Sequence, residues 1–349
     1  MKSKKILIIS FLFISVISAS AQQRPFSDWD ATAFCSYTRY HPFKYIRADN
    51  NWDILQALRN PHPRHYLDSL GIKNTESQIM LLSIEGFVQQ KENGDWQSVI
   101  PIFDSIQTLE ARTLSLNIAS DLYKTIKSDC SFFADFLSNE KLQDNAYSIL
   151  FSYILDGEIW NYFNSYEELK SAATWNGMCW FFYSPRSFRS GTNQFNNEFH
   201  LCWTENQPDF ISKELNSSDF VIPFLEEFKK YEKIVSEDLK LKAISLGMIH
   251  ENGTLNIPVI DRADKDSQLN IISDRIIKAI VDYFTDSGII DSFQDKFGVS
   301  HKKLACTILY HEVMWDLMDL LLGDKIIELP VVWKSQNKRD TYSVIYIEK

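Results

Sequence analysis

The sequence predicts a mainly helical α+β protein built from two tandem copies of one unit, packed about a pseudo-twofold axis. Three observations predict this class. The segment ENGDWQSVIPIFD (92–104) has a near match in ENGTLNIPVID (251–261). A second match, LNIASD (116–121) with LNIISD (269–274), follows in the same order. Each copy then carries a helical segment that is apolar nearly all round, as buried helices are.

The constant order of these matches is the basis for an internal duplication. The segment that starts at Ala146 aligns with the one that starts at Ala305, which adds a third matched place. Spacing between matched residues changes only between elements, where loops tolerate insertions. Self-similarity at a long period indicates a duplicated structural unit. Chance similarity is the alternative, because few of the matched residues are identical.

Each copy is expected to begin with a helix that ends in a hairpin. Residues 75–90 carry apolar residues at helical spacing after Thr75, a residue type that caps helices. Asn93-Gly94 then lies between two extended runs, which is a strong β-hairpin signal. In the second copy, the helical pattern of 236–249 leads to the same turn at Asn252-Gly253.

A long amphipathic helix is expected after each hairpin, followed by the apolar helix and two strands. Asp104 or Asp261 precedes the amphipathic helix and is expected to cap it. The apolar helices span 145–163 and 303–322. The predicted terminal β-hairpins pair 178–184 with 198–204 in the first copy and 330–335 with 341–348 in the second.

Composition divides the chain into five segments. Residues 1–21 are predicted to be a signal peptide, because lysines precede an apolar run and Ala19-Ser20-Ala21 provides small residues for cleavage. A retained membrane anchor is the alternative. We therefore expect an exported, soluble protein, periplasmic or extracellular. The other segments are an aromatic-rich arm (22–60), repeat unit 1 (61–204), a linker (205–219) and repeat unit 2 (220–349).

Charge and cysteine content disfavour several classes of protein. The net charge of −10 lacks the basic footprint that phosphate contacts need, so no nucleic-acid partner is expected. No segment after residue 21 approaches membrane-spanning length. The five cysteines are widely spaced without a CxxC pair, unlike a zinc module. Cys179 and Cys202 would face each other in the predicted hairpin, which predicts a cross-strand disulfide.

Residues 65–103 resemble a winged-helix module. HYLDSLGIKNTESQIMLLSIEGFVQQKENGDWQSVIPIF reads as a short helix, a turn, a second helix and a hairpin wing, and LGMIHENGTLNIPVI (246–260) is similar to the last part of it. The resemblance implies that the second helix reads the major groove of DNA. That helix has no Lys or Arg and carries Glu76 and Glu85. We therefore interpret the module as a packing unit or a protein-binding surface.

The sequence YHEVMWD (310–316) contains the candidate catalytic residues. His311 and Glu312 point about 100° apart on a helix, whereas Glu312 and Asp316 share a face. Such a face could bind a hard cation or supply acid–base groups. The second histidine of a zinc-peptidase helix is missing. A solvated face or a satisfied buried His–carboxylate pair is the alternative interpretation.

Two further groups of residues are candidate sites. His62 and His65, with His41 upstream, could contribute metal ligands, but no neighbouring Cys or acidic cluster completes a set. The sequence therefore predicts no metal and no cofactor. The long connection 185–197 is a candidate recognition loop for a ligand or partner. It carries Arg186, Phe188, Arg189 and Phe195.

The residues that repeat are apolar and turn-forming. This pattern favours a copied structural unit over a duplicated active site. We expect a non-catalytic binding or scaffolding protein of the cell envelope, with a protein, peptide or glycan ligand. The alternative is a hydrolase with a cleft between the copies, using His311, Glu312 and Asp316. No GxSxG elbow, Walker loop or dinucleotide fingerprint is present.

Overall fold

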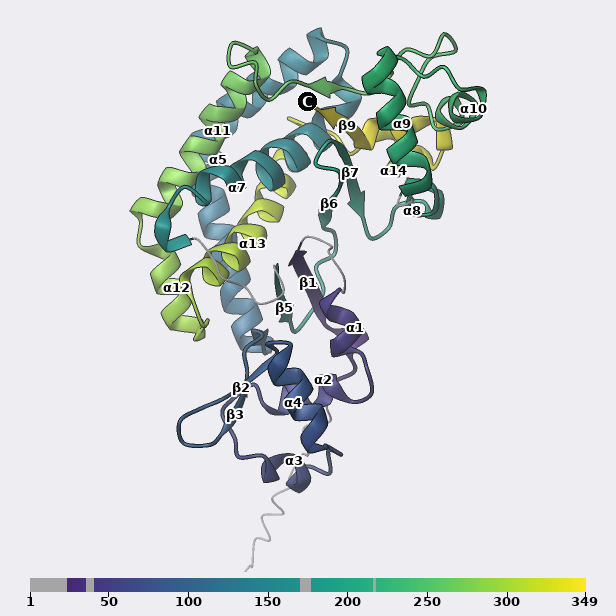
Figure 1. Ribbon diagram of the computed structural model, residues 1–349. Coiled ribbons are helices and arrows are strands. Elements are labelled where there is room, and N and C mark those ends of the chain that lie inside the picture. The colour runs from purple at the N-terminus through teal and green to yellow at the C-terminus, as the bar shows by residue number, and fades with distance from the viewer. Residues whose placement is uncertain (1–23, 36–40, 170–176, 216–217) are drawn as a thin grey trace, which may run out of the picture. The chain divides into compact units, whose positions relative to one another are not determined.

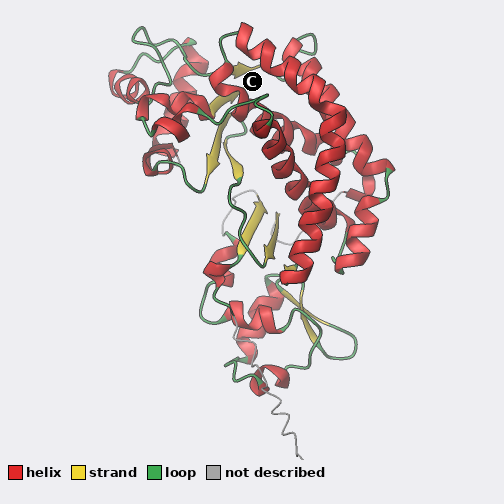
Figure 2. Cartoon of the chain, turned by 180° about the vertical axis from the view of Figure 1, so that it is seen from behind, coloured by secondary structure: helices red, strands yellow, loops and turns green. Residues whose placement is uncertain are grey.

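The computed structural model describes residues 24–35, 41–169, 177–215 and 218–349, which form two compact units. Among them, unit 1 comprises 24–29 and 41–100, and unit 2 comprises 30–35 and the described residues from 101 to 349. The predicted signal peptide lies outside the described residues. The expected mixed, mainly helical α+β class is confirmed, because short strands accompany many helices (Figure 2).

Unit 1 is a small helical unit with one hairpin (Figure 1). Its helices are η1 (Phe26–Asp28), α1 (Pro42–Ile46), α2 (Asn51–Ala57), α3 (His65–Ser69) and α4 (Glu76–Ile84). Its strands are β2 (Val88–Gln90) and β3 (Trp96–Ser98), which pair antiparallel.

Unit 2 combines long helices with two sheets. One sheet has the order β1-β5-β4, and the other has the order β6-β7-β9-β8. The strands are β1 (Asp30–Cys35), β4 (Ile102–Phe103), β5 (Gly177–Phe182), β6 (Ser190–Phe195), β7 (Phe199–Thr204), β8 (Val259–Ile260) and β9 (Ile345–Glu348). The helices are α5 (Ser105–Asn139), η2 (Gln143–Asn145), α6 (Ala146–Ser148), η3 (Ile149–Glu158), α7 (Ile159–Phe163), η4 (Glu167–Leu169), α8 (Asp209–Leu215), α9 (Ser218–Tyr231), α10 (Glu237–Ser245), α11 (Gln268–Asp286), α12 (Ile289–Phe297), α13 (Lys302–Gly323), α14 (Val331–Ser335) and η5 (Lys338–Val344).

Helix α4 starts where the sequence predicts and ends earlier. The Thr75 hydroxyl accepts a hydrogen bond from Gln78 N at 3.1 Å, so the predicted cap is confirmed. The helix stops before residue 90 because Gly86 adopts a φ of +74°, which favours glycine and ends helices. The hairpin predicted at Asn93-Gly94 is confirmed by the pairing of β2 with β3.

The second Asn-Gly turn has the same backbone geometry as the first. Gly94 and Gly253 both have a φ of +87°. Gly94 N donates to Lys91 O at 2.9 Å, and Gly253 N donates to His250 O at 2.9 Å. The strands flanking the second turn are reduced to one bridge between Ile249 and Leu255.

The segments after the two turns also make matching bonds. Pro101 O accepts from Phe181 N at 2.9 Å, and Pro258 O accepts from Ile347 N at 2.9 Å. The strand after each proline then runs parallel to the strand that donates this bond, β4 to β5 and β8 to β9. Each of those two strands pairs antiparallel on its other side, β5 with β1 and β9 with β7.

The long amphipathic helices begin in different ways. Asp104 forms a capping box with Gln107 at the start of the 35-residue α5, which confirms the predicted cap. Asp261 does not cap α11, because that helix starts at Gln268, after Ser267. Helices α11 and α13 both pack along α5 (Figure 1).

The two apolar helical segments are buried, as predicted. Nearly every side chain of α13 is shielded from solvent. The first segment is continuous through α6, η3 and α7, and η3 is a ten-residue π-helix. Within η3, a Cβ on Gly157 would lie 2.6 Å from Ser152 O, so this wider turn requires glycine there.

The predicted hairpin between 178–184 and 198–204 is wrong. Strands β5 and β7 belong to different sheets, and β6, inside the expected loop, pairs with β7. Cys179 lies opposite Ala33, and Cys202 lies opposite Thr192. The predicted disulfide between Cys179 and Cys202 is therefore wrong as well, and the Cys202 thiol is free.

The predicted terminal hairpin of the second copy is also wrong. Residues 330–335 were expected to form a strand from their β-branched run, but Val331–Ser335 is the short helix α14. The backbone N of Val332 donates to Ser343 Oγ at 3.3 Å.

The expected linker 205–219 contains α8. None of the described helices has the length and apolar character needed to cross a membrane.

Candidate functional site

Glu312 and Asp316 lie one turn apart on α13 and share an arginine. Arg186 Nη2 lies 2.8 Å from Glu312 Oε2, and its Nη1 lies 2.8 Å from Asp316 Oδ1. Arg112 Nε approaches the same Glu312 oxygen at 3.1 Å. Ser115 Oγ donates to Asp316 Oδ2 at 2.5 Å. Burial alone would lower the pKa of Arg186, but the charges of Glu312 and Asp316 raise it above its ordinary value.

Arg112 and a further arginine, Arg189, contact the carboxylate of Asp30 at the start of β1. Arg112 Nη2 lies 2.7 Å from Asp30 Oδ2, and Arg189 Nη1 lies 2.5 Å from Asp30 Oδ1. The backbone N of Arg186 also donates to Asp30 Oδ2, at 3.1 Å. Arg189 Nε donates to Glu205 Oε1 at 2.9 Å. We call the set the arginine network: Arg112, Arg186 and Arg189 with Asp30, Glu205, Glu312 and Asp316.

Most of the arginine network is buried, although the Glu205 side chain is 48% exposed, and its carboxylates act as hydrogen-bond acceptors. The side chains of Glu312 and Arg186 are only 2% and 9% exposed. Carboxylate oxygens that accept from guanidinium groups are already occupied by those donors, so this arrangement does not suit acid–base chemistry on a substrate. Removing one partner of a buried ion pair costs about 3–5 kcal/mol of stability, because the other charge is left uncompensated. The arginine network is therefore better suited to stabilising the fold than to catalysis.

The arginine network joins residues that the sequence presented as separate candidates. Arg186 and Arg189 were candidates for ligand recognition, whereas Glu312 and Asp316 were candidates for catalysis in the alternative hydrolase interpretation. The structure brings them together. Arg112 and Asp30 were missed, because no local pattern marks them: Arg112 and Glu312 are 200 residues apart in the chain.

The two phenylalanines of the expected recognition loop are packed against other rings. Phe188 lies 6.0 Å from Trp333 between ring centroids, and Phe195 lies 6.1 Å from Phe199. Both are partly buried against the core. Part of the loop is strand β6, and both phenylalanines pack within unit 2.

His311 points away from the arginine network into a cluster of aromatic rings. Its ring centroid lies 5.0 Å from that of Phe34, 5.3 Å from Trp160 and 5.2 Å from Trp180. Its Nδ1 lies 2.7 Å from Thr307 O, so this nitrogen carries the proton and donates it. Burial lowers the pKa of His311 to about 4, although the Thr307 carbonyl opposes the shift.

The other ring nitrogen of His311 faces an acid that the sequence did not indicate. His311 Nε2 lies 3.8 Å from Asp156 Oδ1, on the π-helix η3. Burial raises the pKa of Asp156 to about 7, and the nearby Thr192 hydroxyl and Trp160 indole N–H oppose the rise. A histidine and a carboxyl therefore meet in the interior.

The histidines considered as metal ligands have structural roles. The backbone of His62 bridges to Trp96, and its ring stacks on Tyr66 with centroids 3.8 Å apart. His65 is the first residue of α3, and His41 caps α1. Across the described parts of the chain, no group of three or more His, Cys, Asp or Glu side chains could hold a metal ion.

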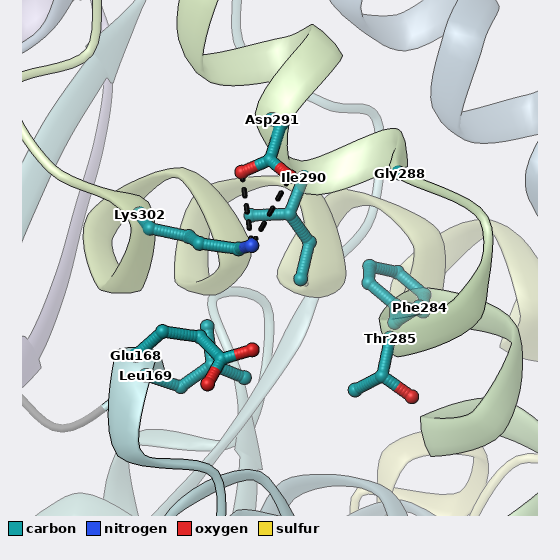
Figure 3. Close-up of a pocket in the computed structure, with 8 residues that line it drawn as sticks. All are labelled: Glu168, Leu169, Phe284, Thr285, Gly288, Ile290, Asp291 and Lys302. Atoms are coloured by element: carbon teal, nitrogen blue, oxygen red, sulfur yellow. Dashed lines mark hydrogen bonds and ion pairs between the residues drawn. The ribbon is translucent and has the colours of Figure 1, made fainter.

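A small pocket lies among η4, α11, α12 and α13, where Figure 3 shows its eight lining residues. The Lys302 ammonium lies 2.9 Å from Asp291 Oδ1 and 3.1 Å from Asp291 Oδ2. This lysine is therefore already neutralised, and the Glu168 carboxylate is the remaining charged group that lines the pocket. The arrangement indicates no specific ligand.

Helix α4 of unit 1 exposes large apolar side chains. Met80, Leu81 and Ile84 are 51%, 47% and 71% exposed. The opposite face of the same helix is buried, with Ile79 at 2% and Leu82 at 1%. We call Met80, Leu81 and Ile84 the α4 face. Exposed apolar faces of this kind occur at interaction surfaces of other proteins.

Comparisons with known proteins add no assignment. The chain has no significant match to a family model, to a curated protein or to a solved structure. Function must therefore be argued from the residues of the two units themselves.

Proposed function

We propose that the chain is a non-catalytic binding protein of the cell envelope and that the α4 face is its binding surface. The observation that carries the proposal is the exposure of Met80, Leu81 and Ile84 on a helix whose other face is fully packed. Burying one such side chain against a partner is worth about 1.5–3 kcal/mol. Export is supported by the signal-peptide pattern of residues 1–21.

The charges of α4 indicate the chemistry of the partner. Glu76 lies in its first turn and Glu85 follows its last residue, whereas the helix contains no Lys or Arg. A complementary partner presents apolar side chains flanked by Lys or Arg. A glycan is disfavoured, because its hydroxyl groups need hydrogen-bonding partners that aliphatic side chains do not provide. The partner class is therefore a protein or peptide.

The hydrolase alternative fits the structure less well. Glu312 and Asp316 would have to leave Arg186 before either could exchange a proton with a substrate. His311 is separated from them by its direction on the helix and is enclosed by aromatic rings. These contacts support binding over catalysis.

We also propose that the chain is a duplication of a winged-helix-like unit. The matched bonds at Gly94 and Gly253, and at Pro101 and Pro258, support it. In this proposal the copies have other boundaries than expected, because β1 would correspond to β7 as the antiparallel neighbour of β5 or β9. The proposed copies then run from β1 to β5 and from β7 to β9, so the expected arm contributes its strand to the first copy.

Peptide titration tests the binding proposal. The probe is an amphipathic helix-forming peptide of leucine and lysine, and a leucine–glutamate peptide of the same pattern is its control. Isothermal titration should detect the basic peptide and not the acidic one. Met80→Ser combined with Ile84→Ser should weaken binding at least tenfold, since a tenfold change corresponds to about 1.4 kcal/mol.

Two matched variants decide whether the binding belongs to the α4 face. Leu241 of α10 and Leu109 of α5 are also well exposed, at 64% and 69%. Leu241→Ser and Leu109→Ser should leave the affinity unchanged. Equal affinity in wild type and in the Met80/Ile84 variant would refute the proposal, as would loss of binding in either control.

A further inference from the structure

Asp156 and His311 meet in the interior of unit 2 without the charges that stabilise the arginine network. The Asp156 side chain is 9% exposed, and that of His311 is 6% exposed. Among the described residues, Asp156 Oδ1 has no hydrogen-bond partner of normal geometry. Its distance of 3.8 Å from His311 Nε2 is longer than a hydrogen bond but needs less than about 1 Å of adjustment to become one.

The tautomer of His311 decides which partner can donate. Because Nδ1 donates to Thr307 O, Nε2 of the neutral ring carries a lone pair and can only accept. A protonated Asp156 carboxyl would supply the matching donor. An ionised Asp156 would instead place two lone pairs against each other.

The groups around this pair are uncharged. Thr192 and Trp160 approach Asp156, and Cys202, Tyr310 and Tyr346 approach it from β7, α13 and β9. Burial raises the pKa of each of those last three groups, so all stay neutral.

Charged groups adjacent to the pair in the chain, or packed on the ring of Trp160, have other partners. Glu312, next to His311, binds Arg186 and Arg112. Glu158, two residues after Asp156, pairs with Arg262. Lys303 lies on the ring of Trp160 at 5.4 Å, donates to Asn164 Oδ1 at 2.7 Å, and burial lowers its pKa.

From this geometry we infer that Asp156 and His311 form a buried acid–imidazole pair that folds in its uncharged form, with the proton on the Asp156 carboxyl. A charged pair here would lack the additional hydrogen bonds that offset the desolvation of two ions. The neutral pair avoids that desolvation. In the unfolded chain at about pH 5, Asp156 is ionised and His311 is protonated. Folding thus moves one proton from the imidazolium to the carboxylate, and no proton is gained or lost overall.

This proton balance predicts that the pair adds no pH dependence to the stability of the wild type. A variant that lacks one of the two groups should acquire a pH dependence. Between about pH 4 and 6.5 the folded and unfolded pairs hold the same number of protons, so the pair contributes no slope to stability. With Asp156→Asn, only the unfolded His311 binds a proton in this range. The folding equilibrium constant relative to wild type should then rise about tenfold per pH unit. With His311→Gln it should fall about tenfold per unit, because only the folded Asp156 holds a proton.

Nitrogen-15 NMR of the wild-type histidine rings tests the charge state directly. At about pH 6, between the two folded pKa values, His311 should show the neutral ring protonated on Nδ1. The His311→Gln variant identifies its signal among the seven histidines. Infrared spectra at the same pH should contain a protonated carboxyl band that Asp156→Asn removes. An imidazolium signal from His311 at that pH would overturn the inference. Equal pH slopes in wild type and both variants would overturn it as well.

Discussion

The two Asn-Gly segments share a backbone and differ in what surrounds them. Gly94 and Gly253 have the same φ of +87° and the same turn hydrogen bond. A Cβ added to Gly94 would meet nothing within 4 Å, whereas one added to Gly253 would clash with Ile234 O. The same turn is therefore open in unit 1 and enclosed in unit 2.

The helices before the turns show the same difference. Counted from the first residue of each helix, Leu241, Lys242 and Ser245 of α10 correspond to Met80, Leu81 and Ile84 of α4. In α10 two of the three are polar, while α4 is apolar at all three. Helix α10 also packs against α9 and η5 within unit 2. The comparison teaches that α10 uses its surface for packing within unit 2, while α4 keeps an apolar face exposed.

The largest expected effect separates the two glycines. An L-residue at a positive φ costs about 1–2 kcal/mol, so Gly94→Ala should destabilise by that amount. Gly253→Ala adds a steric clash worth about 1–3 kcal/mol. Urea unfolding of both variants measures the difference. Equal losses would show that the second turn is not enclosed as described.

The helix starts provide a smaller contrast. Asp104→Ala removes the capping box of α5 and should cost about 1 kcal/mol. Ser267→Ala at the start of α11 removes no side-chain cap and should change stability by less than about 0.5 kcal/mol. Thermal unfolding compares the two. A larger loss for Ser267→Ala would contradict the difference between the helix starts.

The smallest effect is expected on the α4 face. Because Ile84 is 71% exposed, Ile84→Ser should change the unfolding free energy by less than about 0.5 kcal/mol. Leu241→Ser should behave alike. Denaturant unfolding at equal protein concentration checks both. A loss above about 2 kcal/mol for Ile84→Ser would mean that this side chain is packed in the folded chain and is not free for a partner.

Local signals in the sequence were reliable where the structure depends on neighbouring residues. The Thr75 and Asp104 caps, the Asn93-Gly94 turn and the buried apolar helix α13 were all predicted from short patterns. Asp261 has the same local pattern as Asp104 but caps nothing, since a loop delays α11 to Gln268.

Predictions that depended on distant pairing failed. The hairpin and disulfide at Cys179 and Cys202 assumed that consecutive strands pair, but β6 intervenes. Its sequence, SGTNQF, is polar and gave no strand signal. The arginine network could not be predicted either, because Asp30, Arg112 and Glu312 meet only after β1, α5 and α13 have packed.

The path of the chain between the units limits how the protein can be cut. Residues 24–29 belong to unit 1 and residues 30–35 to unit 2. The chain then completes unit 1 with residues 41–100 and returns to unit 2 at residue 101. Unit 1 therefore lies on both sides of β1 in the chain, and an amino-terminal truncation that removes unit 1 would also remove β1 and Asp30. In the shortened chain, β5 would lose its antiparallel partner β1. Arg112 and Arg189 would lose the Asp30 carboxylate. Separating unit 2 intact would require removing the residues before Asp30 and also the stretch between β1 and β4, with the chain rejoined between these two strands.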